Sequence, residues 1–341
     1  MNEALNRFRR VCAAPEETAA AWRATGGKVV GYVGHDVPAP MIHAAGLLPI
    51  RLSGNPARPS DEADRYLGIG LDPAARALLA ALLRGDHAWC DHLVLTQDCH
   101  AHLQLFYALR EIQRVEPRAH LPEPYFLDLL HLPHRTSARY NTHRLADFAR
   151  TLGAWGGRDV DTAAMNRSIG LYRADAEATR RVLAARREIP AELTGSAALA
   201  VVGARERMPI EEHHVLVREL LASVGLATGA GPRTEPARTG TRVFLTGSSH
   251  DHPALYDELE AAGIVIVGED HDWGELLVEE DIPTGRHPLT ALVEHHQYGP
   301  TGSPRARIAD RARRTRDGAL RGRADIVVSA VRAVDDAPLW D

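Results

Sequence analysis

Short apolar runs alternate with segments of helical periodicity at both ends of the chain. The runs have the length and composition of buried strands, and they lie at residues 28–34, 47–52, 92–96, 124–130, 242–246, 264–267 and 324–330. Helical patterns lie at residues 39–45, 74–84, 102–115, 142–152, 162–188, 211–226, 253–262 and 304–320. Because parallel strands need crossover helices between them, this alternation predicts an α/β fold with parallel sheets.

The middle of the chain has a different pattern. Helical periodicity dominates from about residue 136 to 226, and the segment 227–241 has the Gly- and Pro-rich composition of a linker. We therefore expect an N-terminal α/β lobe at 1–135, a mainly helical connecting segment at 136–232 and a C-terminal α/β lobe at 233–341. The chain stops soon after the last predicted strand, which fits either a short lobe or an incomplete sequence.

Length, composition and charge exclude several classes of protein. The chain has 341 residues, of which 45% are hydrophobic and 25% charged, as in an ordinary globular protein. Its net charge of −5 disfavours a strongly basic nucleic-acid-binding protein. The sequence lacks the long apolar run of a membrane span and the apolar N-terminal stretch of a secretory signal. We expect a cytoplasmic protein that binds neither nucleic acid nor membranes.

Three cysteines limit the metal and disulfide chemistry of the chain: Cys12, Cys90 and Cys99. No two of them form a CxxC pair, which disfavours a disulfide framework and an all-cysteine metal site within one chain. Cys99 follows Asp98 at the end of a predicted strand. A thiolate there can bind a metal or act as a nucleophile, and the alternative is a semi-buried thiol. Cys90 precedes the same strand and is predicted to be a core residue.

Polar loops follow the predicted strands at the ends where open parallel sheets bind ligands. These loops are residues 34–36, 97–100, 247–252, 268–272 and 329–335. Each loop alone has a structural explanation, because Asp, Ser and Gly cap helices and form turns. Together the loops predict a site in this crevice. A zinc or iron site that uses His250, His252 and His271 is one alternative.

Several motifs occur in a characteristic order along the chain. They are GYV at 31–33, Val37-Pro38, AAGLLPIRL at 44–52, HLVLTQDC at 92–99, RVFLTG at 242–247, GEDHDWG at 268–274, Arg307 and ADIVVSA at 324–330. This order resembles the 2-hydroxyacyl-CoA dehydratase family, which includes 2-hydroxyglutaryl-CoA dehydratase and benzoyl-CoA reductase subunits.

The resemblance implies two flavodoxin-like α/β lobes joined by a helical segment. It also implies a lyase that acts on an acyl-CoA thioester by one-electron chemistry at a [4Fe–4S] cluster, which three cysteines hold in each subunit. The implied partners are a related cysteine-complete subunit, or a second copy in a homodimer, and an ATP-dependent activator protein.

The chain departs from the family pattern at the cluster ligands. Cys99 stands at the second ligand position, whereas Asp72 stands near the first, Asp335 near the third and His271 in the acidic turn. An ordinary cluster cannot be built from Cys99 alone, because its core is stabilised by soft thiolates. The candidate metal ligands are Cys99, Asp72, Asp335 and His271, and the candidate substrate contacts are His35 and Arg51.

Three functional hypotheses remain open. The first is a subunit of a dehydratase or reductase complex in which Cys99 is a residual ligand and the partner chain carries the full cluster. The second is a non-catalytic or repurposed member that keeps the fold to bind a partner or acyl-CoA. The third is a mononuclear metal enzyme that uses Cys99, His250, His271 and Asp335. Zinc, iron or no metal are the alternatives to the [4Fe–4S] cluster.

Overall fold

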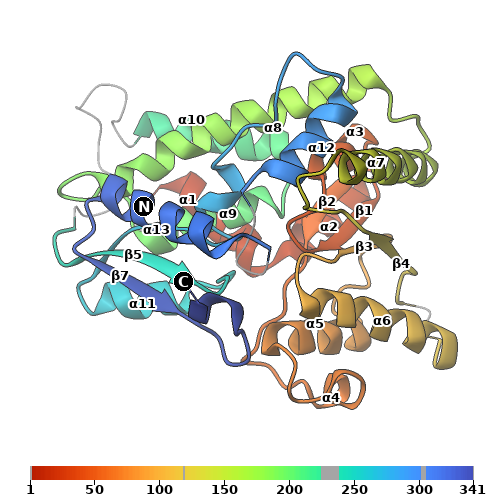
Figure 1. Cartoon of the computed structure of the whole chain (residues 1–341), viewed down its shortest axis with the longest axis horizontal. Coiled ribbons are helices and arrows are strands. Elements are labelled where there is room, and N and C mark those ends of the chain that lie inside the picture. The colour runs from red at the N-terminus through yellow and green to blue at the C-terminus, as the bar shows by residue number, and fades with distance from the viewer. Residues whose placement is uncertain (1, 118–119, 224–237, 301–304, 341) are drawn as a thin grey trace. The chain divides into compact units, whose positions relative to one another are not determined.

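A computed structural model of the chain describes residues 2–117, 120–223, 238–300 and 305–340 (Figure 1). Residues 227–237 of the predicted linker lie outside the described residues. The chain divides into two compact units. Unit 1 comprises Met1–Ala14, Leu171–Asp281 and Pro300–Asp341, and unit 2 comprises Pro15–Gly170 and Ile282–Gly299. The division into an N-terminal lobe, a helical segment and a C-terminal lobe stays a prediction.

Unit 2 contains a four-stranded parallel sheet with the strand order β2-β1-β3-β4. Its strands are β1 (Val29–Val33), β2 (Leu48–Arg51), β3 (His92–Thr96) and β4 (Pro124–Leu127). Val30 of β1 pairs with Pro49 of β2 and with His92 of β3. The four strands predicted in this part of the sequence are therefore confirmed.

Helices cover both faces of the unit 2 sheet. They are α2 (Pro15–Ala24), α3 (Ala39–Ala44), α4 (Asp61–Leu67), α5 (Pro73–Arg84), α6 (His100–Val115), α7 (Arg135–Gly156) and α12 (Pro288–Tyr298). On one face Val29 and Leu93 join a core with α2, α4, α5 and α6. On the other face Val30 and Tyr32 join a core with α3, α7 and α12. Since neighbouring strand residues face opposite cores, the strands are continuous apolar runs rather than alternating ones.

Unit 1 contains a three-stranded parallel sheet with the strand order β6-β5-β7. Its strands, β5 (Arg242–Gly247), β6 (Val265–Glu269) and β7 (Ile326–Ala330), confirm the predicted C-terminal strands. Its α-helices are α1 (Glu3–Ala13), α9 (Gly195–Arg205), α10 (Ile210–Ser223), α11 (Ala254–Ala261) and α13 (Ile308–Gly322), and α8 (Thr162–Leu183) crosses the division between the units. The short 3-10 helices are η1 (Ala184–Arg187), η2 (Glu275–Val278) and η3 (Ala337–Trp340).

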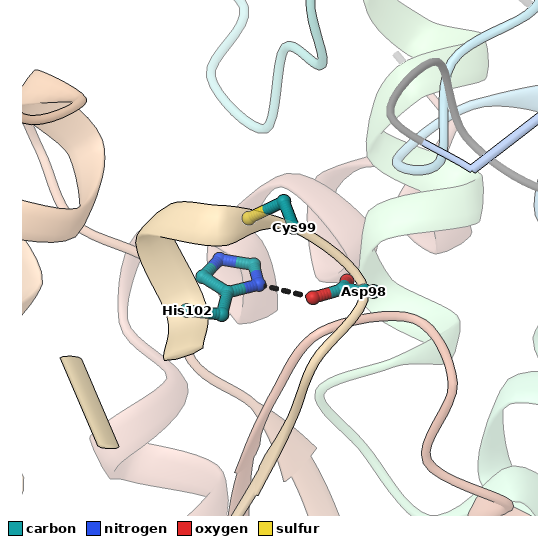
Figure 2. Close-up of side chains that lie close together, drawn as sticks. All are labelled: Asp98, Cys99 and His102. Carbon is teal, nitrogen blue, oxygen red and sulfur yellow. Dashed lines mark hydrogen bonds and ion pairs between the residues drawn. The ribbon is translucent and has the colours of Figure 1, made fainter. Parts of the chain in front are cut away.

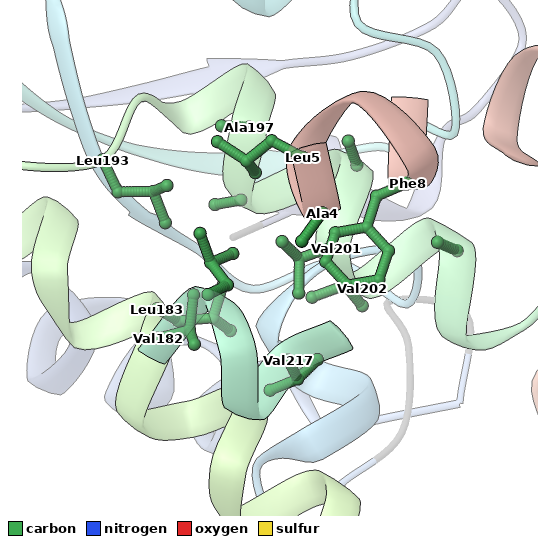
Figure 3. Packing of buried hydrophobic residues seen from close by; sticks show 14 of the residues in the cluster. Ala4, Leu5, Phe8, Val182, Leu183, Leu193, Ala197, Val201, Val202 and Val217 are labelled. Carbon is green, nitrogen blue, oxygen red and sulfur yellow. The ribbon is translucent and has the colours of Figure 1, made fainter. Parts of the chain in front are cut away.

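Unit 1 also has a hydrophobic core that is formed mainly by helices. Leu5 and Phe8 of α1 pack with Val201 and Val202 of α9 and with Val217 of α10 (Figure 3). Nearly all of α9 is buried, and its residues are apolar on every side. Such a helix has no amphipathic period, which is why the sequence pattern did not identify it.

Both units are thus parallel α/β lobes, which confirms the predicted fold class. Each sheet presents the carboxyl ends of its parallel strands at one edge, where ligand sites of open sheets occur. Among the described helices, none combines the length and the hydropathy of a bilayer-spanning segment.

Candidate functional site

Two polar loops meet at the carboxyl ends of β1 and β3 in unit 2. The strands are neighbours, with Val33 beside Leu95. Gly34 follows β1 with a φ of +98°, and a Cβ at this position would lie 2.0 Å from Oγ1 of Thr96. Glycine satisfies both the positive φ and the close approach. The two loops thereby bring His35 against the loop that follows β3.

Asp98 is the centre of this arrangement and is only 4% exposed. Its Oδ2 accepts the backbone N–H of His35 at 2.9 Å and lies 3.4 Å from Nδ1 of the same residue. Its Oδ1 lies 2.5 Å from Nδ1 of His102. Burial alone would raise the pKa of Asp98, but His102 and His35 outweigh burial and hold this pKa well below its usual value. Asp98 is therefore an anion that positions two imidazoles.

Cys99 and His102 lie at the start of α6, next to Asp98. Cys99 is the N-cap residue of the helix and is partly exposed. Its Sγ, a carboxylate oxygen of Asp98 and a ring nitrogen of His102 lie within 4.8 Å of one another (Figure 2). Burial alone would lower the pKa of His102, but Asp98 and Cys99 outweigh burial and raise it well above its usual value. The site thus joins a thiol, an imidazolium and a carboxylate.

A second pair of imidazoles adjoins this site in unit 2. Asp36 is 2% exposed, and its two oxygens lie 2.8 Å from Nε2 of His131 and 3.3 Å from Nε2 of His35. Burial would raise the pKa of Asp36, but His35 and His131 outweigh burial and lower it. In His296 of α12, burial and the adjacent His295 lower the pKa to about 3. The loop edge of unit 2 therefore holds one charged imidazole, His102, and one neutral imidazole, His296.

Asp72 and Arg51 are the other two predicted site residues of unit 2, and both are part of its secondary structure. Asp72 is the N-cap of α5, and its carboxylate accepts the N–H of Ala74 at 2.7 Å. It belongs to none of the groups of closely spaced ligand side chains found in the described residues. Arg51 lies on β2 and is 2% exposed. The metal role of Asp72 and the substrate contacts of Arg51 and His35 stay predictions.

In unit 1, His271 is buried and uses both of its ring nitrogens. Nδ1 accepts the backbone N–H of Trp273 at 3.3 Å, so Nε2 carries the proton and faces the hydroxyl of Tyr256 at 2.8 Å. Burial lowers the pKa of His271 to about 3, so the ring is neutral. The predicted neighbour His250 stacks edge-on against it, with ring centroids 5.6 Å apart. A metal would have to displace one of these hydrogen bonds.

Unit 1 also contains a buried ion pair that sequence reasoning missed. Arg186 is fully buried, with Nη1 2.5 Å from Glu269 and Nη2 2.7 Å from Glu275. Both glutamates line a cavity of about 400 Å³ within this unit. Glu269 lies in the predicted polar loop 268–272, which is a weak signal, and in the structure it is the last residue of β6. Nothing in the helical pattern around Arg186 distinguishes it from an exposed arginine.

The donor set does not fit a [4Fe–4S] cluster held by three thiolates of this chain. Cys90 is a buried core residue, as predicted, and Cys12 of α1 contacts a backbone oxygen of α9. Near the other two predicted ligand positions stand Asp72, which caps a helix, and Asp335, which lies 2.5 Å from the hydroxyl of Ser248. Cys99 is thus the single thiolate available for a cluster type that takes cysteine ligands.

Comparison with known proteins gives a family for this chain. The sequence model of the family described as 2-hydroxyglutaryl-CoA dehydratase, D-component, matches residues 35–332. A benzoyl-CoA reductase subunit of Thauera aromatica is 22% identical over 271 residues, which are 78% of this chain and 67% of that protein. The beta subunit of lactoyl-CoA dehydratase of Anaerotignum propionicum is 23% identical over 341 residues, which are 99% of this chain and 87% of that protein. The chain therefore belongs to the 2-hydroxyglutaryl-CoA dehydratase D-component family, which confirms the resemblance found in its sequence.

Proposed function

We propose that this chain is a subunit of an enzyme of the 2-hydroxyacyl-CoA dehydratase or benzoyl-CoA reductase type, completed by a related cysteine-complete subunit. The observation that carries the proposal is the family match over residues 35–332, which includes every strand of both sheets except β1. Both relatives are named as subunits, which supports a partner chain. The single thiol at the expected ligand positions supports a complex whose partner holds the [4Fe–4S] cluster.

In this complex the one-electron chemistry belongs to the partner subunit and the acyl-CoA thioester is the shared substrate. An ATP-dependent activator protein supplies the electron. The present chain contributes the loop edge of unit 2, where the positive charge of His102 favours a thioester or carboxylate oxygen.

The surface of unit 1 supports association with a related subunit. β7 is an edge strand of the described sheet, and its residues Ile326 and Val327 are 51% and 46% exposed. Leu339 and Trp340 of η3, in the same unit, are exposed as well. An open strand edge with apolar side chains is a surface that proteins normally cover.

Anaerobic co-expression with a related subunit that has all three cysteines tests the proposal. We expect the two chains to co-elute in a fixed ratio, with iron and acid-labile sulfide in the complex. With an activator ATPase, ATP and a reductant, the complex is expected to convert lactoyl-CoA or benzoyl-CoA. Ile326→Glu is expected to weaken the complex at least about tenfold, which corresponds to about 1.4 kcal/mol.

Ile69→Glu is the matched control, because Ile69 is 80% exposed and lies in unit 2. Separate elution of the two chains at micromolar concentration would refute the proposed partner. Turnover by this chain alone, assembled as a homodimer with the activator, would refute the assignment of the chemistry to the partner.

A further inference from the structure

Cys99, His102 and Asp98 have the contacts of a nucleophile, a base and an orienting carboxylate. Nδ1 of His102 faces Oδ1 of Asp98 at 2.5 Å, which leaves Nε2 of the ring for a second partner. Sγ of Cys99 lies within 4.8 Å of a ring nitrogen of His102 and of a carboxylate oxygen of Asp98. Asp98 is itself fixed by the backbone N–H of His35 at 2.9 Å. The same order of groups activates cysteine and serine nucleophiles in unrelated folds.

The start of α6 explains why these three side chains meet. Cys99 is the N-cap residue with an extended backbone, φ −142° and ψ 165°, and His102 is the third helical residue. Side chains at these two positions approach each other in helices, as they do in a capping box. Asp98 precedes the cap and reaches His102 as an i, i+4 pair. One turn of backbone therefore fixes the triad.

The same helix end suits an attack on a carbonyl carbon. The N–H groups in the first turn of a helix have no acceptor within the helix, and the helix dipole favours negative charge there. An oxyanion formed next to Cys99 would find these donors in place. Cys99 is only partly buried and the His102 side chain is 24% exposed, so a substrate from solvent can reach both.

We propose that Cys99 is a nucleophile that accepts the acyl group of an acyl-CoA thioester and passes it to water. In this proposal His102 is the general base and acid, and Asp98 is a positioning residue. The choice of acyl-CoA rests on the proposed function, whereas the triad rests on the geometry of unit 2. The reaction is a thioester hydrolysis and is separate from the one-electron chemistry of the partner subunit.

The reaction balances without an oxidant or a reductant. Cys99 releases its proton to solvent, because His102 is already an imidazolium, and Sγ attacks the thioester carbonyl carbon. The bond from this carbon to the sulfur of CoA breaks, and CoA leaves as a thiol with the proton from His102. Water then gives a proton to the neutral His102 and attacks the acyl-cysteine. The acid leaves, and Sγ takes a proton back from solvent.

Intact-mass spectrometry of the acid-quenched full-length chain tests the proposal, with butyryl-CoA and S-butyryl-N-acetylcysteamine as probes. We expect one butyryl adduct, mapped to Cys99 by peptide analysis, and release of CoA and butyrate. Cys99→Ser is expected to abolish the adduct. His102→Gln is expected to slow acylation by about 10²–10⁴-fold.

His100→Gln is the matched control, since His100 is an exposed imidazole in the same turn of α6. Its rate is expected to equal that of the wild type. Asp98→Asn is expected to lower the single-turnover rate constant of acylation at saturating thioester, whereas a loss of folding would lower the amount of adduct formed and leave this rate constant unchanged. Circular dichroism verifies that each variant is folded.

Three results would overturn the proposal. The first is no adduct from either thioester on the folded wild-type chain. The second is an adduct that survives Cys99→Ser. The third is a stoichiometric zinc or iron ion whose binding requires Cys99 and His102. An adduct from the N-acetylcysteamine thioester but none from butyryl-CoA would refute the CoA substrate and so place the failure in the proposed function, while the nucleophile stands.

Discussion

Lowering the pH from 7 to 5 is expected to destabilise unit 1 through His271. In the folded chain, burial lowers the pKa of this imidazole from 6.5 to about 3. The unfolded chain therefore binds a proton below pH 6.5 that the folded chain does not bind. Stability is unchanged by this group above pH 6.5 and falls as the pH drops below it, by about 1.4 kcal/mol per pH unit. Between pH 7 and pH 5 the expected loss is about 2 kcal/mol.

Urea unfolding of the wild type and of His271→Gln at both pH values measures this loss. Glutamine keeps a hydrogen-bonding side chain next to Tyr256 but does not titrate. His92, His250 and His296 also have lowered pKa values, but they titrate equally in both proteins. The wild type should therefore lose about 2 kcal/mol more than the variant. His143→Gln, at an exposed position of α7, should behave as the wild type. An equal pH dependence in wild type and His271→Gln would refute the reasoning.

Three further predictions concern stability, and urea unfolding checks each of them. Glu269→Gln removes one carboxylate from buried Arg186 and is expected to lower the free energy of unfolding by about 3 kcal/mol. The control Glu258→Gln, on the exposed side of α11, is expected to leave it almost unchanged, and equal effects of the two variants would contradict this prediction. Phe8→Ala empties a fully buried position of unit 1 and is expected to cost about 3–5 kcal/mol, so a loss below about 1 kcal/mol would show that α1 is not part of that core. Gly34→Ala combines a φ of +98° with a Cβ 2.0 Å from Thr96 and is expected to cost more than about 1 kcal/mol; a neutral effect would exclude this loop geometry.

The strands could be predicted from the sequence because helices cover both faces of each buried strand. Every residue of β1 is buried, so its sequence is an unbroken apolar run between polar loops. The amphipathic helices α5 and α6 were predicted for a related reason, since each has one buried face. α9 has no polar face and so leaves no periodic signal in the sequence. α1 has one buried face, with Ala4, Leu5, Phe8 and Val11 at helical spacing, but the other members of its core lie more than 160 residues further along the chain, and spacing does not reveal that partnership.

The candidate site could be predicted only in part. The position of Cys99 after β3 followed from the rule that ligand sites lie at the carboxyl ends of parallel strands. His102 was missed because the predicted helix began at residue 102, whereas α6 begins at His100. This shift of two residues hides the relation between the N-cap and the third helical residue. The burial of Asp98 and the pairing of Arg186 with Glu269 depend on contacts between distant segments, which composition and spacing do not contain.

The central claim is that this chain is a family subunit with one thiol at the ligand positions and no three-thiolate cluster of its own. Iron and acid-labile sulfide in the anaerobically purified chain, measured alone and in complex with the cysteine-complete subunit, test it most directly. We predict only traces of both in the chain alone, and stoichiometric iron and sulfide in the complex that are unchanged by Cys99→Ser. Iron and sulfide near the four-to-four ratio of a [4Fe–4S] cluster in the chain alone would contradict the account.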